Sequence, residues 1–152
     1  VKLTWDFGDG TTQNGGSSAT HTYAKGGFYV VTVTADDGKG GSCSVASDTT
    51  YVRVNTPPVA SAGQNKVCCL DQEVGFDASA SSDADGNDLT YKWNFGDGNG
   101  AEGAKVSHTY KKNGNYKVVV VVNDGSGTPC SESTAGFDAK VNASPVSVIE
   151  VR

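Results

Sequence analysis

The chain has 152 residues, of which 36% are hydrophobic and 19% charged, and its net charge is −5. This length fits one ordinary domain or two small ones. A negative charge without a basic cluster excludes a typical nucleic-acid-binding protein, and no apolar run is long enough to cross a membrane. Glycine occurs 20 times, and Gly/Asp/Asn clusters separate short runs of Val, Tyr and Phe. This composition predicts an all-β fold of short strands.

The expected strands follow from these short apolar runs and from side-chain alternation. In the first third of the chain we expect, in order, Lys2–Asp6, Ala19–Tyr23, Phe28–Ala35 and Thr50–Val54. In the remainder we expect Val59–Ala62, Glu73–Ala78, Leu89–Asn94, Lys105–Tyr110, Tyr116–Asn123 and Gly136–Val141. The predicted fold class is therefore a pair of tandem β-sandwiches, the first of them incomplete.

Most of the sequence occurs twice. Trp5–Gly10 (WDFGDG) returns 88 residues later as Trp93–Gly98 (WNFGDG). His21–Tyr23 (HTY) returns 87 residues later as His108–Tyr110, and the valine-rich strand and its Asp-Gly turn follow at the same offset. Self-similarity at a fixed period is the signature of a repeat protein.

The repeats divide the chain into three parts. Residues 1–55 are expected to form a partial repeat that lacks its leading strands, and residues 56–142 a complete one. Residues 143–152 resemble the start of another repeat, and we expect them to serve as its leading strand or as a donor strand for a neighbour. Because Met is absent, we expect that residue 1 is not a translation start. The partial repeat, the full repeat and the leading strand together predict a window cut from a longer array.

These spaced motifs together resemble polycystic kidney disease (PKD) repeats. The signature is a WDFGDG turn, then HTY, then an alternating Tyr/Val strand that ends in Asp-Gly, and only Asn94 departs from it. The resemblance implies immunoglobulin-like sandwiches on an extracellular or cell-surface protein. It also implies a spacer or interaction module rather than an enzyme, and the sequence contains no motif of a known catalytic site.

Several aromatic and polar side chains have expected structural roles. An aromatic ring on a central strand fills the space between two sheets, so the candidate core residues are Trp5, Trp93, Tyr23 and Tyr110. Tyr51, Tyr91 and Phe137 are also expected to face a core. Asp9, Asp97, His21 and His108 are expected to make hydrogen bonds in turns rather than to bind metal or catalyse.

The four cysteines are expected to form disulfides, which are the default in extracellular modules. One pairing joins Cys69 to Cys130 within the second repeat and Cys43 to Cys68 between the repeats. The alternative joins Cys43 to Cys69 and Cys68 to Cys130. The sequence does not choose between them.

Calcium is the one cofactor that the resemblance suggests. Some PKD-like modules bind calcium between an Asp-x-Asp loop and the Asp-Gly turn after the valine strand, and the matching residues here are Asp83, Asp85 and Asp124. Carboxylate oxygens are suitable ligands for calcium. The alternative is that these residues form solvated turns.

Two functions remain open from the sequence. The first is a non-catalytic structural or adhesive module, acting as a rigid spacer or as a building block of a surface assembly or filament. Its partners would be other repeats of the chain or neighbouring subunits, with homo-oligomers possible. The second is an accessory module of a secreted hydrolase that contacts polysaccharide or fibrous protein.

Overall fold

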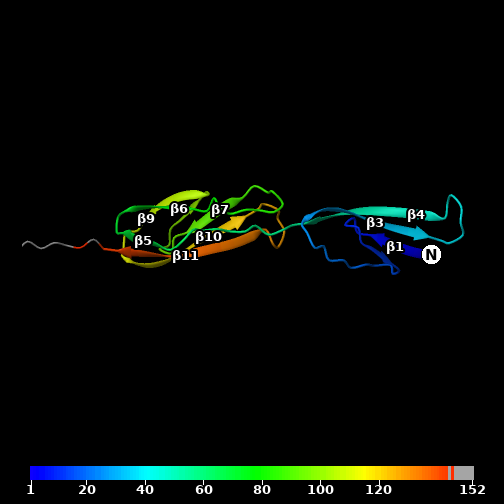
Figure 1. The fold of residues 1–152 in the computed structure, drawn as a ribbon, viewed down its shortest axis with the longest axis horizontal. Helices are drawn as coiled ribbons and strands as arrows, with labels where there is room; N and C mark the ends of the chain where they lie inside the picture. Colours follow the sequence, from blue (N-terminus) through cyan, green and yellow to red (C-terminus); the bar gives the residue numbers. More distant parts are fainter. Residues whose placement is uncertain (144, 146–152) are drawn as a thin grey trace, which may run out of the picture. The chain divides into compact units, whose positions relative to one another are not determined.

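The computed structural model describes residues 1–143 and 145, which fall into two compact units, Val1–Thr56 and Pro57–Arg152. All of the regular elements in these described residues are β-strands (Figure 1). The fold is therefore all-β. A strand is also expected at residues 143–152, but residues 144 and 146–152 lie outside the described residues.

Unit 2 is a sandwich of two sheets. The larger sheet has the order β5-β11-β10-β7-β8, and the smaller one pairs β6 with β9. Figure 1 shows β6 and β9 on one side of the unit and the long strands on the other. The strands are β5 (Lys66–Cys69), β6 (Glu73–Asp77), β7 (Thr90–Asn94), β8 (Gly100–Glu102), β9 (Lys105–Thr109), β10 (Gly114–Asn123) and β11 (Glu132–Asn142).

The core of unit 2 is made by side chains that alternate inward along these strands. On β10, Val118, Val120 and Val122 are fully buried, because successive side chains point to opposite faces of a strand. Phe76 on β6 packs against Trp93, with 5.8 Å between ring centroids. A fully buried side chain of this size contributes about 1.5–3 kcal/mol, so both sheets depend on this contact layer.

Unit 1 is a single sheet with the order β2-β1-β3-β4. Its strands are β1 (Lys2–Asp6), β2 (Thr12–Asn14), β3 (Gly27–Asp36) and β4 (Val45–Val54). These correspond in the same order to β7, β8, β10 and β11 of unit 2, and residues 1–56 contain no counterpart of β5 or β6. Consequently Trp5 is only partly buried, whereas Trp93 is 4% exposed.

The expected strand at Ala19–Tyr23 is wrong, because this segment has no regular strand structure. Its counterpart in unit 2 is β9, which pairs with β6 along its whole length. The described part of unit 1 offers no such partner, and an unpaired strand leaves its backbone groups without a ladder.

Three other expectations differ from the structure. The predicted strand Val59–Ala62 is reduced to a single bridge between Val59 and Ser82. The last strand of each unit is longer than predicted: β4 begins at Val45 instead of Thr50, and β11 at Glu132 instead of Gly136. The short strands β2, β5 and β8 were not predicted, since three or four residues carry too little alternation to be recognised.

Candidate functional site

The best-defined polar cluster surrounds the turn after β7. The Asp97 carboxylate lies 2.8 Å from Nε2 of His108 and accepts a hydrogen bond of 3.0 Å from the backbone N–H of Asn99. The His108 ring stacks on Phe95, with centroids 4.3 Å apart and planes at 2°. The turn itself needs glycine, because Gly96 has φ +82° and a Cβ there would lie 2.6 Å from the Lys117 carbonyl oxygen.

The same cluster is built a second time in unit 1. Asp9 lies 2.7 Å from Nε2 of His21, and the His21 ring stacks on Phe7 at 4.3 Å. Hydrogen bonds from Thr11 and His21 lower the pKa of Asp9 to about 2. In unit 2 burial opposes ionisation of Asp97, yet hydrogen bonds from His108 and Asn99 outweigh it and the pKa of Asp97 is lowered.

The tyrosines next to these histidines also hold the turn. The Tyr110 hydroxyl donates a 3.1 Å hydrogen bond to the Phe95 carbonyl, and burial raises the pKa of Tyr110 to about 12. Tyr23 donates to Phe7 in the same way, at 3.0 Å. Tyr110 is 1% exposed, whereas Tyr23 is only partly buried. The side chains of the cluster therefore bind one another and the backbone of the turn, which favours a structural role over catalysis.

The candidate calcium residues lie in two separate turns. Oδ1 of Asp83 accepts hydrogen bonds from the backbone N–H groups of Asp85 and Asn87, at 2.9 and 3.2 Å. Oδ2 of Asp83 is buried and accepts none, a feature that suits a cation. Asp124 is 4% exposed, and its Oδ1 accepts a hydrogen bond from the Ser126 backbone.

The structure does not assemble these carboxylates into a metal cluster. Within residues 1–143 and 145, no three His, Cys, Asp or Glu side chains are arranged to hold a metal ion. Calcium binding by Asp83, Asp85 and Asp124 therefore stays a prediction.

The expected disulfides within unit 2 are wrong. β5 runs parallel to β11 and places Cys69 opposite Asn142, whereas Cys130 precedes the first residue of β11. Twelve residues of extended chain separate these two ends, roughly 40 Å, and a disulfide needs Cα atoms within about 7 Å. The same register excludes Cys68–Cys130. None of the four cysteines in the described chain is in a disulfide, and a bond from Cys43 to Cys68 or Cys69 stays a prediction.

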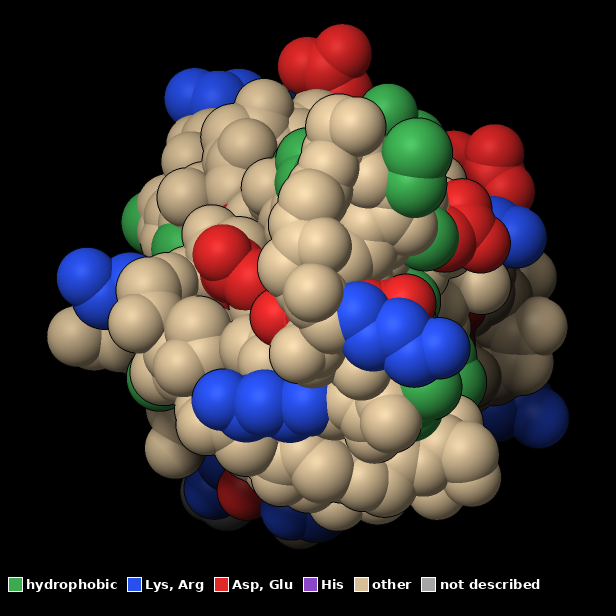
Figure 2. Space-filling model, turned by 90° about the vertical axis from the view of Figure 1, so that its right-hand side faces the viewer, with side chains coloured by type: hydrophobic (Ala, Val, Ile, Leu, Met, Phe, Trp, Pro, Cys, Tyr) green, Lys and Arg blue, Asp and Glu red, His purple; other side chains and the backbone are tan. Residues whose placement is uncertain are grey.

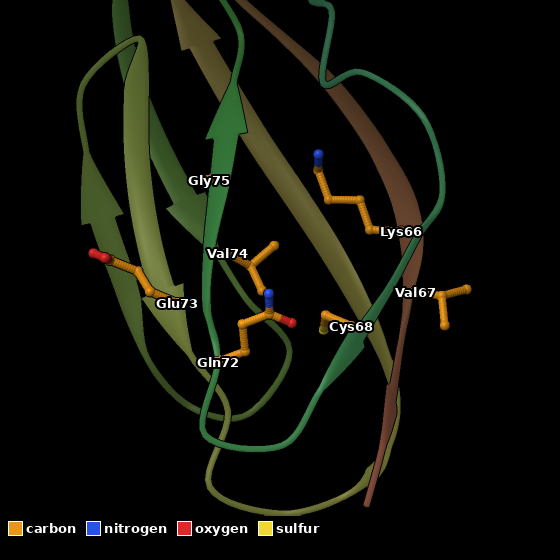
Figure 3. A pocket seen from close by; sticks show the side chains of 7 residues that line it. All are labelled: Lys66, Val67, Cys68, Gln72, Glu73, Val74 and Gly75. Carbon is orange, nitrogen blue, oxygen red and sulfur yellow. The ribbon is translucent and has the colours of Figure 1, made fainter. Parts of the chain in front are cut away.

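A pocket of about 290 Å³ lies between β5 and β6. Figure 3 shows the side chains of Lys66, Cys68, Gln72 and Val74 pointing into it, and that of Val67 pointing away. Burial raises the pKa of the Cys68 thiol, and the thiol form is a poor nucleophile. The pocket therefore lacks the activated group that a cysteine enzyme needs.

The sequence analysis does not predict the exposed aromatic residues of unit 1. Tyr51 was expected in a core but is 64% exposed, and Phe28 beside it is 67% exposed. Phe137 is buried at 7% and Tyr91 only partly. The error arose because both faces of β3 and β4 carry apolar residues, so alternation alone does not tell the inner face from the outer one.

The surface charge is mixed. The face drawn in Figure 2 carries acidic and basic side chains side by side, with hydrophobic side chains in small separate areas. In the described part of the chain, no helix is long and apolar enough to cross a membrane.

The known proteins that this chain resembles are much longer than the chain itself. It is 38% identical over 84 residues to Collagenase ColA of Clostridium perfringens, covering 55% of this chain and 8% of that protein. It is 34% identical over 123 residues to human Polycystin-1, covering 78% of this chain and 3% of that protein. The chain thus spans less than a tenth of either relative.

A solved structure and a family model agree with the fold. The fibronectin(III)-like modules of Clostridium thermocellum CbhA superpose with a TM-score of 0.50 at 17% identity, covering 99% of this chain and 83% of that one. The family model described as PKD domain matches residues 1–54 and again residues 55–139. With both repeats matched, the chain belongs to the PKD domain family.

Proposed function

We propose that the chain is a non-catalytic spacer of an extracellular or cell-surface protein, whose tandem modules hold other parts of that protein apart. The observation that carries this proposal is the use of the signature residues. Asp97 and His108 bind each other, and Tyr110 donates to the backbone of the turn. Their counterparts in unit 1 make the same contacts. A side chain committed to such contacts holds the fold rather than a substrate.

The connection between the units supports a spacer. The two units meet between Thr56 and Pro57, and Pro58 follows at once. Proline fixes its own φ and restricts the residue before it, so a short Pro-Pro joint is stiffer than a Gly/Ser linker. An extracellular setting also suits a family that includes a collagenase and Polycystin-1 as relatives.

The spacer proposal is tested by the distance distribution between the units. Small-angle X-ray scattering of the parent should give a narrow distribution, because the joint is short and contains two prolines. A variant with a Gly-Ser insertion between Thr56 and Pro57 should give a broader one. Equal breadth in parent and variant would remove the argument for a rigid spacer.

A finer form of the proposal is that these modules are building blocks of a surface assembly or filament, joined to neighbouring subunits. The partly exposed Trp5 on the inner face of unit 1 supports it, since a sheet without a second layer can accept strands from another chain. Light scattering over a range of concentrations, with electron microscopy of the same sample, tests it. Polymers that are abolished by Trp5→Ser would support assembly. A monomer at every concentration would contradict assembly and leave only the spacer proposal.

A further inference from the structure

One sheet face of unit 1 displays large apolar side chains to water. It is the side of β3 and β4 that points away from Trp5 and Val31, and we call it the outer face. Phe28 and Tyr51 are 67% and 64% exposed, their ring centroids lie 5.5 Å apart, and their planes are inclined by 30°. Val30, which is 44% exposed, lies opposite Tyr51 in the strand register. Together they form a shallow apolar platform.

Unit 2 shows that the fold does not require this platform. At the three equivalent strand positions it carries Asn115, Lys117 and Asp138. The strand register is the same, and Lys117 pairs with Asp138 through an ion pair of 2.8 Å. Because a charged pair serves the same backbone equally well, the aromatic residues of unit 1 need a reason other than folding.

The rest of the outer face is rich in hydroxyl groups. Beyond the platform, the register pairs Thr32 with Thr49 and Thr34 with Ser47. From Phe28 to Thr34 the strand extends about 20 Å. Over these four cross-strand pairs the single charged side chain is Arg53, at the end next to Phe28. The neighbouring strand β1 adds Thr4 opposite Thr34 and Asp6 opposite Thr32 on the same face. The outer face is therefore a flat strip with rings at one end, hydroxyl groups along the remainder, and the Asp6 carboxylate at its β1 edge.

We propose that the outer face binds an extended, neutral polysaccharide. One side of a sugar ring presents C–H groups of slight positive charge, which the negative face of an aromatic ring attracts. The sugar hydroxyls both donate and accept hydrogen bonds, as do those of Thr and Ser. The strip carries one cation, Arg53 opposite Phe28, and one carboxylate, Asp6 opposite Thr32, rather than a row of charges of one sign. A polymer of many like charges finds no complementary row there, so the chemistry of the strip matches a neutral polymer, whose hydroxyl groups can also donate to Asp6.

The same composition argues against a protein partner. Protein interfaces draw their affinity from aromatic and Arg side chains set in desolvated pockets, and Ser, Thr and Val are under-represented among those energetic centres. Here the rings are tilted side by side on an open sheet, and half of the eight residues in the four cross-strand pairs are Thr or Ser. A flat hydroxylated strip is suited to a ligand that is itself covered with hydroxyl groups.

The two repeats supply matched variants for the test. The triple substitution F28N/V30K/Y51D gives unit 1 the residues that unit 2 tolerates at the same positions. The reciprocal triple N115F/K117V/D138Y gives unit 2 a second platform. Circular dichroism melts of both variants check that the sheets remain intact.

Co-sedimentation with microcrystalline cellulose and with chitin measures binding. The parent should bind at least one of them, the unit 1 triple should bind about tenfold more weakly through loss of two ring contacts, and the unit 2 triple should bind more tightly. The proposal would be overturned if the parent bound neither polymer, or if both triples bound as the parent does. The proposal would also be overturned, in favour of a protein partner, if the unit 1 triple abolished binding to collagen fibrils or dimerisation in light scattering and left binding to the two polysaccharides unchanged.

Discussion

The aromatic residue at the centre of each repeat shows how strongly the surroundings decide what one side chain contributes. Trp93 is 4% exposed, and its indole N–H donates a 3.0 Å hydrogen bond to the Gly103 carbonyl. Trp5 occupies the same position in unit 1 but is only partly buried, and its hydrogen bond to Gly16 is longer, at 3.4 Å. The residue is identical, and the difference lies in the second sheet that packs on it.

We therefore expect Trp93→Ala to destabilise unit 2 by about 3–5 kcal/mol, because the substitution opens a cavity in a packed core. Trp5→Ala is the matched control and should cost unit 1 clearly less. Urea denaturation followed by circular dichroism measures both losses, and hydrogen exchange assigns each transition to its unit. Equal losses in the two variants would contradict the difference in burial.

Acid should weaken both units through the aspartates of the turns. The pKa of Asp9 is lowered to about 2 from an ordinary value of 3.8, and that of Asp97 is also lowered. Below the ordinary value the unfolded chain takes up protons that the folded chain refuses. The stabilisation is therefore complete above about pH 4 and is lost as the pH falls toward 2.

The measurement is the urea midpoint between pH 6 and pH 2. The urea midpoint of the D9N/D97N variant should fall less steeply with pH than that of the parent. Part of the fall should remain, because the pKa of Asp77 is also lowered to about 2. A decline of the same steepness in the variant would show that other groups control the acid sensitivity.

At the scale of the elements, pairing partners decide more than the local sequence does. The long strands β3 and β10 were predictable because alternation over ten residues is a strong signal. Ala19–Tyr23 has the same local motif as β9, yet it is no strand, since the partner that β6 provides in unit 2 has no counterpart in residues 1–56. Local sequence gives the tendency to be extended, and the ladder supplies the hydrogen bonds.

The cysteine error has a similar origin. Position in the sequence suggested that Cys69 and Cys130 join the first and last strands of the repeat. The two strands are indeed neighbours, but their parallel register puts the two cysteines at opposite ends. Register depends on how the sheets pack, and no turn between β5 and β11 fixes it locally.

Supplying the second layer should order unit 1. We expect that a copy of residues 57–88 fused ahead of Val1 forms counterparts of β5 and β6, turns Ala19–Tyr23 into a strand and shields Trp5. Acrylamide quenching of tryptophan fluorescence should then fall. A Gly/Ser extension of equal length is the control, and equal quenching with both extensions would contradict the inferred role of the missing layer.

The Asp83–Asp88 loop carries the calcium prediction. If calcium binds there, adding it should raise the melting temperature of the parent, because a ligand that binds only the folded state stabilises it. Asp83→Ala should remove that rise, since the buried Oδ2 of Asp83 would be a ligand. Differential scanning calorimetry with calcium or with a chelator measures the effect, and a parent melt that ignores calcium would refute the site.

On the scale of the whole molecule, two copies of one module have diverged on the faces that the fold leaves free. The turn cluster is repeated nearly side chain for side chain, as Phe7 with His21 and Phe95 with His108 show. The outer faces differ in kind, aromatic and hydroxylated in unit 1 and charged in unit 2. A tandem array can thus keep one architecture while each module presents a different surface.

The parallel pairing of β5 with β11 has a mechanical consequence. Tension applied between Pro57 and Asn142 pulls these two strands in opposite directions along their length, so the load falls on the pairs from Lys66–Ala139 to Cys69–Asn142 together. A ladder loaded in shear must break its hydrogen bonds at once, whereas one loaded at its end opens bond by bond. Single-molecule pulling should therefore find that unit 2 resists a higher force than a variant with Val67→Pro, which removes a backbone donor from β5. Equal rupture forces would show that the load runs elsewhere.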